Sequence, residues 1–340
     1  MIASPDPDSP VVQGPAQLVR ERAALVDRAL AEVTMDLPAR PASLYAPVRY
    51  VLEAKGKRLR PAVVVLAAEA FGARPDDVVP AGLAAEVFHA FTLVHDDIMD
   101  HSDERRGRPT VHVRWDEPTA ILAGDYLMGL AYDLLGRARG EDRPAVQAAW
   151  HRMVRRLCEG QAMDKAFETA DDVTVADYLA MIEGKTGALL ACCLEVGARL
   201  GGASDEDADA LYEAGLDLGR AFQIQDDLLD LTAESADWGK PIGGDVVEGK
   251  RTFLLLTALE RADAGSDDAA FFARALRGLR QDEVGEVRDR MDRLGVLEAA
   301  AAAVDRYAAA GQRALRTTLP PGPAAAALLF VAARLGRRAR

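Results

Sequence analysis

The chain has 340 residues, 49% of them hydrophobic, and a formal net charge of −13 at pH 7. This length and apolar content allow a large buried core, whereas the negative charge argues against general binding of nucleic acids. The three cysteines lack C-x-x-C spacing, the first residues lack the features of a signal peptide, and the uninterrupted apolar runs are shorter than the roughly 20 residues that span a bilayer. We therefore expect a cytoplasmic protein without a transmembrane segment.

Helical periodicity extends along almost the whole chain, and no run of alternating β-branched residues competes with it. Residues 1–15, rich in Pro, Ser and Asp, are predicted to form a disordered leader. Residues 16–340 are predicted to form a single all-α domain, because no linker rich in Pro, Gly or Ser divides them. The expected helices cover residues 17–34, 43–54, 61–72, 77–99, 118–138, 143–168, 174–200, 204–231, 250–262, 267–279, 282–316 and 322–336.

Two longer stretches without this periodicity stand out, at residues 101–117 and 232–249. Each directly follows a pentad of the form D-D-x-x-D, one from Asp96 to Asp100 and the other from Asp226 to Asp230. Long loops beside a site are usually functional lids or clamps. The two stretches are therefore predicted to cover whatever the pentads bind.

Each pentad ends an apolar helical stretch, and residues four apart on a helix share one face. Each pentad therefore gathers carboxylates at one helix end, where so many like charges would repel one another. Mg²⁺ relieves such repulsion, and it binds through one or two carboxylates per ion while substrate phosphate oxygens and waters complete its shell. Two matching pentads thus predict magnesium and a phosphorylated substrate. Two solvated acidic helix ends are the alternative interpretation.

Several basic residues could bind further phosphate groups. The segment from Lys55 to Pro61 holds four cations just before a proline that suits the first turn of a helix, and helix N-termini favour anions. A solvated basic turn is the alternative. Arg105 and Arg106 form a second cationic pair in the loop after the first pentad, and Lys185 lies inside an apolar helix, where a lysine needs a partner.

In chain order, these residues resemble the motifs of the trans-isoprenyl diphosphate synthases, the polyprenyl synthetase family. The resemblance extends from about Gly56 to Thr252 and depends on the whole set: Gly56-Lys57-Arg58-Leu59-Arg60-Pro61, His89, the first pentad, Arg105-Arg106-Gly107, Gly124-Asp125, Lys185-Thr186, Phe222-Gln223, the second pentad and Lys240. Lys55 stands where the family usually has a glycine, which affects turn geometry more than charge. The resemblance implies an all-α bundle around a central product cavity, of the isoprenoid synthase type I, and a homodimer.

The resemblance also implies the reaction, in which an allylic diphosphate ionises, condenses with isopentenyl diphosphate and loses a proton. The allylic diphosphate would be held by Mg²⁺, three ions per active site, on Asp96, Asp97, Asp100, Asp226, Asp227 and Asp230. The cations that contact it directly would be Arg105, Lys185 and Lys240. Isopentenyl diphosphate would bind without metal to Lys57, Arg60, His89 and Arg106. Oxygens of Thr186 and Gln223 would stabilise the carbocation, so that no protein nucleophile is needed.

Product length in this family depends on bulk in the helix before the first pentad. Phe91 lies five residues before Asp96, and the small Thr92 lies four residues before it. This pair resembles the geranylgeranyl synthases and favours a C20 product over a C15 product. Phe88, about one turn further from the pentad, could shorten the pocket instead.

Four other functions compete with this one. A class I terpene cyclase would carry a different second metal motif and no isopentenyl diphosphate site. A di-iron bundle would need the E-x-x-H of Glu86 and His89 twice, and no other histidine has a glutamate three residues before it. A metal phosphohydrolase based on His95-Asp96 leaves the second pentad unexplained. A non-catalytic subunit of a heteromeric prenyl synthase would not need intact pentads.

Overall fold

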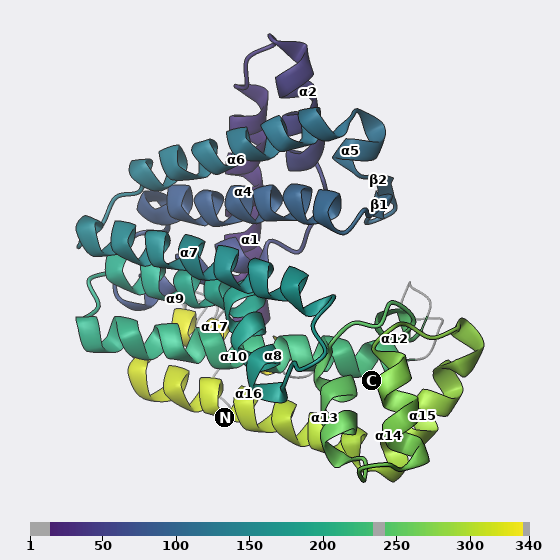
Figure 1. Cartoon of the computed structure of the whole chain (residues 1–340). Helices are drawn as coiled ribbons and strands as arrows, with labels where there is room; N and C mark the ends of the chain where they lie inside the picture. Colours follow the sequence, from purple (N-terminus) through teal and green to yellow (C-terminus); the bar gives the residue numbers. More distant parts are fainter. Residues whose placement is uncertain (1–13, 234–241, 336–340) are drawn as a thin grey trace, which may run out of the picture. The chain divides into compact units, whose positions relative to one another are not determined.

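The structure, a computed structural model, describes residues 14–233 and 242–335 (Figure 1). Within these residues the regular elements are helices, apart from one pair of two-residue strands, and this confirms the predicted all-α class. The chain divides into two compact units, Met1–Ala138 with Pro320–Phe330 and Arg139–Leu319 with Val331–Arg340. The single domain expected for residues 16–340 stays a prediction.

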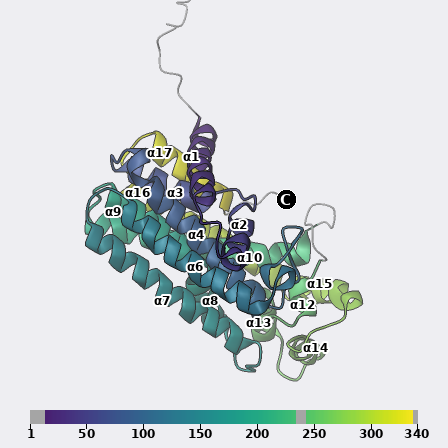
Figure 2. The same cartoon turned by 90° about the horizontal axis from the view of Figure 1, so that it is seen from above.

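The first unit is built mainly from the elements before residue 138. These are α1 (Pro15–Met35), α2 (Ala42–Leu52), α3 (Leu59–Ala70), α4 (Pro75–Met99), β1 (Glu104–Arg105), β2 (Arg108–Pro109), α5 (Val111–Arg114) and α6 (Glu117–Arg137). Helix α17 (Pro323–Leu335) contributes its first residues to this unit and its last ones to the second unit. Helices α4 and α6 run side by side (Figure 1 and Figure 2), and α3 packs against α4.

Helix α4 forms the centre of the first unit. Pro75 suits the first turn, and the aspartates of that turn face the positive end of the helix dipole. Among the described residues α4 is the one helix long and apolar enough to cross a membrane, yet 56% of its most apolar window is buried inside the protein. Such burial is typical of a core helix. The first pentad is therefore carried at the end of a packed and well-supported element.

The second unit is centred on α10 (Asp205–Thr232), with α9 (Ala188–Leu200) and α16 (Val296–Thr318) packed along it (Figure 1). Helix α7 (Arg143–Phe167) lies against α9. The remaining elements are α8 (Val175–Ile182), η1 (Glu183–Gly187), α12 (Gly244–Val247), α13 (Phe253–Arg261), α14 (Asp267–Ala275), η2 (Gln281–Glu283) and α15 (Val284–Arg293). A core of buried apolar side chains, including Ile224, Leu255 and Phe272, joins α10 to α13 and α14.

A π-helical turn, η1, connects α8 to α9 without a break. It is closely packed on two sides, because a methyl group on Gly160 of α7 would overlap the backbone of Lys185, and one on Gly219 of α10 would overlap Gly187. π turns occur frequently at functional sites. These glycines allow α7 and α10 to approach the turn that carries Lys185 and Thr186.

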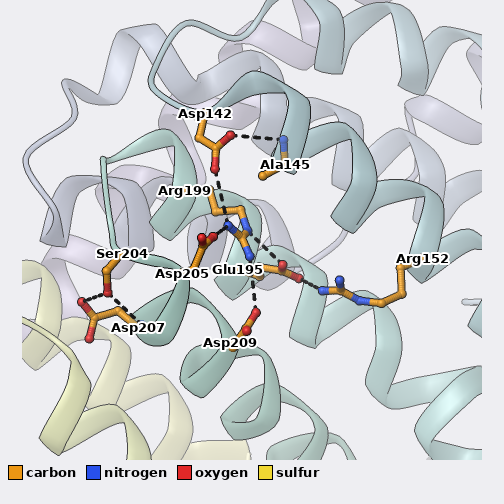
Figure 3. A network of polar contacts seen from close by, with 9 residues as sticks. All are labelled: Asp142, Ala145, Arg152, Glu195, Arg199, Ser204, Asp205, Asp207 and Asp209. Atoms are coloured by element: carbon orange, nitrogen blue, oxygen red, sulfur yellow. Dashed lines mark hydrogen bonds and ion pairs between the residues drawn. The ribbon is translucent and has the colours of Figure 1, made fainter.

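An ion-pair network joins the beginnings of α7 and α10 to α9 (Figure 3). Glu195 is fully buried, and its carboxylate accepts hydrogen bonds from Arg152 and, at 3.0 Å, from Nε of Arg199. The Arg199 guanidinium also pairs with carboxylates at the helix starts, namely Asp142, Asp205 and Asp209. Buried charges are tolerated only with such partners. The network therefore fixes the first turn of α10, the helix whose other end carries the second pentad.

Three sequence predictions need correction. The helix expected over residues 282–316 is wrong: Gly295, with φ 67°, separates α15 from α16. The stretch at 101–117 contains the β1–β2 hairpin and α5, and the described part of 232–249 contains α12. Helix α1 begins at Pro15, inside the predicted leader, and residues 1–13 of that leader lie outside the described residues.

Candidate active site

The first pentad closes helix α4. Asp97 is only 5% exposed, and its Oδ1 accepts a hydrogen bond of 2.6 Å from Nε of Arg105. Burial raises the pKa of Asp97, and the Arg105 charge opposes that rise. An Asp96 carboxylate oxygen lies 4.0 Å from Nη2 of Arg105, and Asp100 is the exposed residue at the helix end. Asp96 and Asp100 thus lie on the more exposed face of the helix end, whereas Asp97 is turned inward.

A cavity of about 360 Å³ lies beside this pentad, within the first unit. Its lining includes Asp97 and three of the cationic or imidazole side chains predicted to bind substrate, His89, Arg105 and Arg106. Leu93 and other apolar residues complete the wall. The structure therefore brings residues from α4 and from the following hairpin to one cavity, whose lining is partly charged and partly apolar.

Tyr50 of α2 holds the hairpin that carries the two arginines. Its hydroxyl donates a hydrogen bond of 2.7 Å to the Pro109 carbonyl, and its ring lies 3.9 Å from the guanidinium carbon of Arg108. Both contacts act on strand β2, which pairs with β1 through Arg105 and Arg108. Nothing in the sequence pattern marked Tyr50, because it is far from the hairpin along the chain.

The basic segment before α3 divides into residues with different surroundings. Lys57 is exposed. Arg58 adopts a left-handed backbone conformation, with φ 47°, and its guanidinium pairs with Asp27 at 2.6 Å and with Glu86 at 2.5 Å. The charge of Arg58 is therefore neutralised inside the protein. Its partner Glu86 is the glutamate of the E-x-x-H sequence, and the ion pair gives that residue a structural role.

Arg60 and His89, both assigned by the family resemblance to isopentenyl diphosphate, lie together, with Nη1 of Arg60 3.3 Å from Nε2 of His89. Burial and the positive charge of Arg60 lower the pKa of His89 well below its usual value. His89 is consequently neutral at pH 7. Because a guanidinium can only donate, Nε2 is the acceptor and the ring proton is on Nδ1. Arg106 also lowers the pKa of His89, and its Nη1 donates to the Lys55 carbonyl at 2.8 Å.

The residues expected to set product length form a ladder on α4. Phe88 is fully buried, and its ring stands edge-to-face with Phe91 at 5.1 Å between centroids. The Phe91 ring packs in turn against His95 at 4.9 Å. The His95 ring occupies the space that a side chain at Gly124 of α6 would fill. Phe91 is thus held between two rings. The contribution of His95 and Gly124 to this ladder was not predicted.

The hydroxyl of Thr92 does not point freely along this helix, because it donates a hydrogen bond of 2.8 Å to the His89 carbonyl. Such back-bonding to the preceding turn satisfies a hydroxyl in a largely apolar setting. A bulkier residue at Thr92 would replace this compact arrangement.

The second pentad closes α10, and two of its aspartates are buried. The Asp227 carboxylate accepts hydrogen bonds from the Tyr178 hydroxyl at 2.6 Å, the Phe253 amide at 3.2 Å and the Gln223 side-chain amide at 3.2 Å. Asp230 accepts a hydrogen bond of 3.1 Å from the amide of Asp245. Asp226 is less buried than either of them.

The surroundings of Asp227 perturb its acidity. Burial, and after it the charge of Asp245, raise the pKa of Asp227 to about 7, and the hydrogen bonds from Tyr178 and Gln223 oppose this rise. A carboxylate so well supplied with protein donors is suited to organising its neighbours. The sequence spacing alone made no distinction between Asp226, Asp227 and Asp230.

The two residues predicted to stabilise a carbocation lie in contact. Thr186, in the π turn, donates from its hydroxyl to Oε1 of Gln223 at 3.0 Å. Beside it, Nζ of Lys185 forms an ion pair of 2.6 Å with Asp164 of α7. Lys240, the remaining predicted substrate cation, lies outside the described residues. Lys250, ten residues further along the chain, pairs with Glu248 at 2.8 Å.

The carboxylates of the pentads suit magnesium in chemistry, since hard oxygen donors are what this ion prefers. Within residues 14–233 and 242–335, no three His, Cys, Asp or Glu side chains lie close enough together to form a complete protein cage. Mg²⁺ usually takes one or two carboxylates and completes its shell with water and phosphate oxygens. The two pentads therefore fit this ion with substrate as co-ligand.

The chain is similar to proteins of known class. A model of the polyprenyl synthetase family matches residues 41–292. The geranylgeranyl diphosphate synthase of Methanosarcina mazei is 46% identical over 246 residues, which cover 72% of this chain and 75% of that protein. The geranylfarnesyl diphosphate synthase of Natronomonas pharaonis is 44% identical over 262 residues, covering 72% and 76%. The crystal structure of a geranylgeranyl pyrophosphate synthetase from Pyrococcus horikoshii superposes with a TM-score of 0.87 at 36% identity, covering 94% of this chain and 97% of that one.

The helical fold and the paired aspartate motifs define a prenyltransferase, a transferase of isoprenoid biosynthesis. The chain belongs to the polyprenyl synthetase family and is a short-chain trans-prenyl diphosphate synthase. Members of this family typically depend on magnesium, and their substrates are prenyl diphosphates.

Proposed function

We propose that this enzyme adds isopentenyl diphosphate to allylic diphosphates and releases mainly geranylgeranyl diphosphate, a C20 product. The observation that carries this product length is Phe91, whose ring is held between Phe88 and His95 with the small Thr92 beside it. The geranylgeranyl diphosphate synthase of Methanosarcina mazei supports C20. The geranylfarnesyl diphosphate synthase of Natronomonas pharaonis represents a longer alternative, and C15 is the shorter one.

The direct magnesium ligands in this proposal are Asp96, Asp100 and Asp226, because they are the more exposed carboxylates of the two pentads. The other three act in support because they are buried: Asp97, Asp227 and Asp230. Bound Mg²⁺ would neutralise the diphosphate as it leaves the allylic carbon. The use of three ions is carried over from the family resemblance.

Isopentenyl diphosphate is assigned to the cavity of the first unit. Arg106 and His89 line this cavity, and Arg60, which is not among the lining residues, contacts His89. The guanidinium groups of Arg60 and Arg106 can each bind phosphate oxygens in a fork. Lys57, which is exposed, would join them as a flexible cation. The apolar part of the cavity wall, including Leu93, suits the isoprenyl group.

The carbocation that forms when diphosphate departs is assigned to the oxygens of Thr186 and Gln223. Their dipoles are fixed before the reaction by the hydrogen bond between them, and fixed dipoles need no reorganisation as charge develops. Lys185 would exchange its ion pair with Asp164 for the diphosphate, and Arg105 and Lys240 would add further positive charge. The proton lost at the end of the condensation goes to the departed diphosphate.

A homodimer and a cytoplasmic location complete the proposal. The homodimer follows from the family resemblance, and the cytoplasmic location from the cysteine spacing and the short apolar runs. The negative net charge fits an enzyme that does not bind nucleic acids.

Product analysis tests the proposal. The purified enzyme is incubated with Mg²⁺, isopentenyl diphosphate and, separately, dimethylallyl, geranyl or farnesyl diphosphate, and the dephosphorylated products are identified by mass. The expected result is a C20 alcohol from every starter. Mainly C15 or C25 products would overturn the assigned length while leaving the enzyme class in place.

A further inference from the structure

Tyr178 is buried at the end of a chain of hydrogen bonds that leads to the proposed carbocation site. It is 2% exposed, and its hydroxyl donates to Oδ2 of Asp227 at 2.6 Å. Burial raises the pKa of Tyr178 well above its usual value, so that the hydroxyl keeps its proton. Neither charge nor motif spacing in the sequence distinguishes this tyrosine from others.

The hydrogen bonds of this series all point toward Asp227. The Thr186 hydroxyl donates to Oε1 of Gln223, and the Gln223 amide nitrogen donates to Oδ1 of Asp227. Tyr178 donates to the other oxygen of the same carboxylate. Both oxygens of the Asp227 carboxylate therefore act as acceptors. Because the Gln223 nitrogen is used on Asp227, its carbonyl oxygen faces Thr186, and the Thr186 hydroxyl donates its proton to that oxygen.

The direction of these hydrogen bonds decides whether Thr186 and Gln223 present oxygen lone pairs or N–H and O–H groups to a cation. With their protons turned toward Asp227, both side chains are left with oxygen lone pairs for the substrate. If the Gln223 amide turned over, it would present an N–H group, which repels positive charge. The orientation of one amide is thus set by the carboxylate, and the carboxylate is held by Tyr178 and the Phe253 amide.

We propose that Tyr178 is a positioning residue for the condensation, acting through Asp227 to fix the orientation of the Gln223 amide. This inference rests on the proposed function of Gln223 and Thr186. It gives Asp227 the task of orienting an amide rather than binding metal, and it adds to the reaction a residue that lies outside the recognised motifs.

Two substitutions test the proposal by different routes. Tyr178→Phe removes one donor to Asp227 and keeps the aromatic packing against Phe253, whose ring centroid lies 6.3 Å away. Asp227→Asn keeps the shape of the side chain but adds a donor. The asparagine oxygen should face the two donors Tyr178 and Phe253, so that its nitrogen faces Gln223 and turns that amide over.

Rates are measured at about pH 8.5 with saturating Mg²⁺. Tyr178→Phe is expected to lower kcat about tenfold, and Asp227→Asn about 10²-fold, as for loss of a stabilising dipole. The KM values of both substrates and the half-saturating Mg²⁺ concentration should stay within about twofold of the parent. The hydrogen bonds from Tyr178 and Asp227 orient the Gln223 amide and contact neither diphosphate. A matched control is Tyr212→Phe: Tyr212 is buried on the same helix as Gln223, roughly three turns away, and should keep the parent kcat.

The decisive step repeats both substitutions in a Gln223→Ala background. If Tyr178 and Asp227 act through Gln223, neither should lower kcat further by more than about twofold. An undiminished effect of Tyr178→Phe in that background would overturn the proposal, and so would a parent-like kcat for Tyr178→Phe. A severalfold rise in the Mg²⁺ requirement of Asp227→Asn would instead make Asp227 a metal ligand, against the proposal. Should Tyr178→Phe fail to fold, the Asp227→Asn arm decides alone.

These outcomes are separate from the fate of the proposed function. An inactive parent enzyme would contradict the proposed function, whereas an active parent with a full-rate Tyr178→Phe variant contradicts only the role of Tyr178.

Discussion

At the scale of single residues, the structure separates side chains that look equivalent in the sequence. Arg58 and Arg60 stand two positions apart in one basic segment. Arg58 is enclosed by Asp27 and Glu86, whereas Arg60 meets neutral His89. A sequence gives the number of charges, but the partner of each charge depends on segments far away along the chain. The two arginines are therefore expected to respond differently to substitution.

Arg60→Ala should raise KM for isopentenyl diphosphate at least about tenfold and change KM for the allylic substrate little, because a charge-assisted hydrogen bond to one diphosphate is lost. Arg58→Ala should instead lower the free energy of unfolding by about 2–3 kcal/mol, since it leaves Asp27 and Glu86 without their cation. Steady-state kinetics and denaturant unfolding of both variants check this. Equal rises of both KM values in Arg60→Ala would refute the assignment of the metal-free site.

His89 predicts a pH dependence of stability. Its pKa is lowered in the folded protein, mainly by burial and then by Arg60, so the unfolded chain binds the proton more readily. The contribution of His89 to the free energy of unfolding is therefore fully present above about pH 6.5, the ordinary histidine pKa. Below that pH the free energy of unfolding falls by at most about 1.4 kcal/mol per pH unit. His89→Asn should reduce the difference in unfolding free energy between about pH 7.5 and pH 5.5.

The control for this experiment is His101→Asn, an exposed residue whose left-handed backbone, φ 51°, asparagine tolerates. It should retain the parent's pH dependence. An identical dependence in His89→Asn and the parent would mean that His89 is not the titrating group.

At the scale of elements, the π turn η1 shows how packing sets the position of chemical groups. Close approach of α7 and α10 requires glycine at the crossing points, and the turn then carries Thr186 to Gln223. Gly160→Ala should lower the free energy of unfolding by about 1–3 kcal/mol, as overpacking does. It should also lower kcat at least tenfold, because the Lys185–Thr186 backbone has to shift.

Gly285→Ala provides the matched control, since Gly285 is an exposed helical glycine of α15 with open space around it. It should be as active as the parent and slightly more stable. Thermal unfolding and steady-state rates distinguish the two variants. Gly160→Ala with parent-like stability and rate would show that the crossing at η1 is not tight.

The aromatic ladder of α4 predicts product length. Phe91 lies five residues from Asp96, roughly 7 Å along the helix axis, within reach of a growing chain whose diphosphate is held at the pentad. Phe91→Ala should lengthen the products, because each further buried methylene contributes about 0.8 kcal/mol. Thr92→Phe should shorten them toward C15. Product masses of both variants are compared with those of the parent at matched conversion. Unchanged product lengths in both variants would mean that Phe88 or a residue of another helix forms the floor of the pocket.

Many helices could be predicted from the sequence because their apolar periodicity and their N-terminal residues are local signals. The break at Gly295 was missed because both flanking helices share the same period, although a glycine in the left-handed region is a common helix stop. The π turn was missed for a different reason. One extra residue in a helical turn leaves the composition unchanged, and only the close glycine contacts with α7 and α10 reveal it.

At the scale of the whole molecule, the two aspartate pentads pointed to a phosphorylated substrate, and the full set of motifs, in chain order, predicted the class of enzyme. The difference in burial among the six aspartates was beyond the sequence. It depends on the contacts that cover each of them, as those with Tyr178 do for Asp227 and those with Arg105 do for Asp97. Such contacts join residues that are far apart along the chain, or they involve a hairpin whose conformation cannot be predicted from the motif.

The central claim is that this chain alone catalyses a magnesium-dependent prenyl transfer through the more exposed carboxylates of both pentads. The most direct measurement is the steady-state condensation rate of the purified chain with Mg²⁺, in excess chelator, and after Mg²⁺ is restored, with Asp226→Ala and the exposed control Glu213→Ala of the same helix in parallel. We expect activity with Mg²⁺, no activity in chelator and full recovery of activity when Mg²⁺ is restored. Asp226→Ala should have a kcat at least about 10²-fold lower, and Glu213→Ala should have a parent-like rate. Full activity in excess chelator would contradict the metal-based mechanism, and inactivity of the folded chain under all conditions would identify it as a non-catalytic subunit.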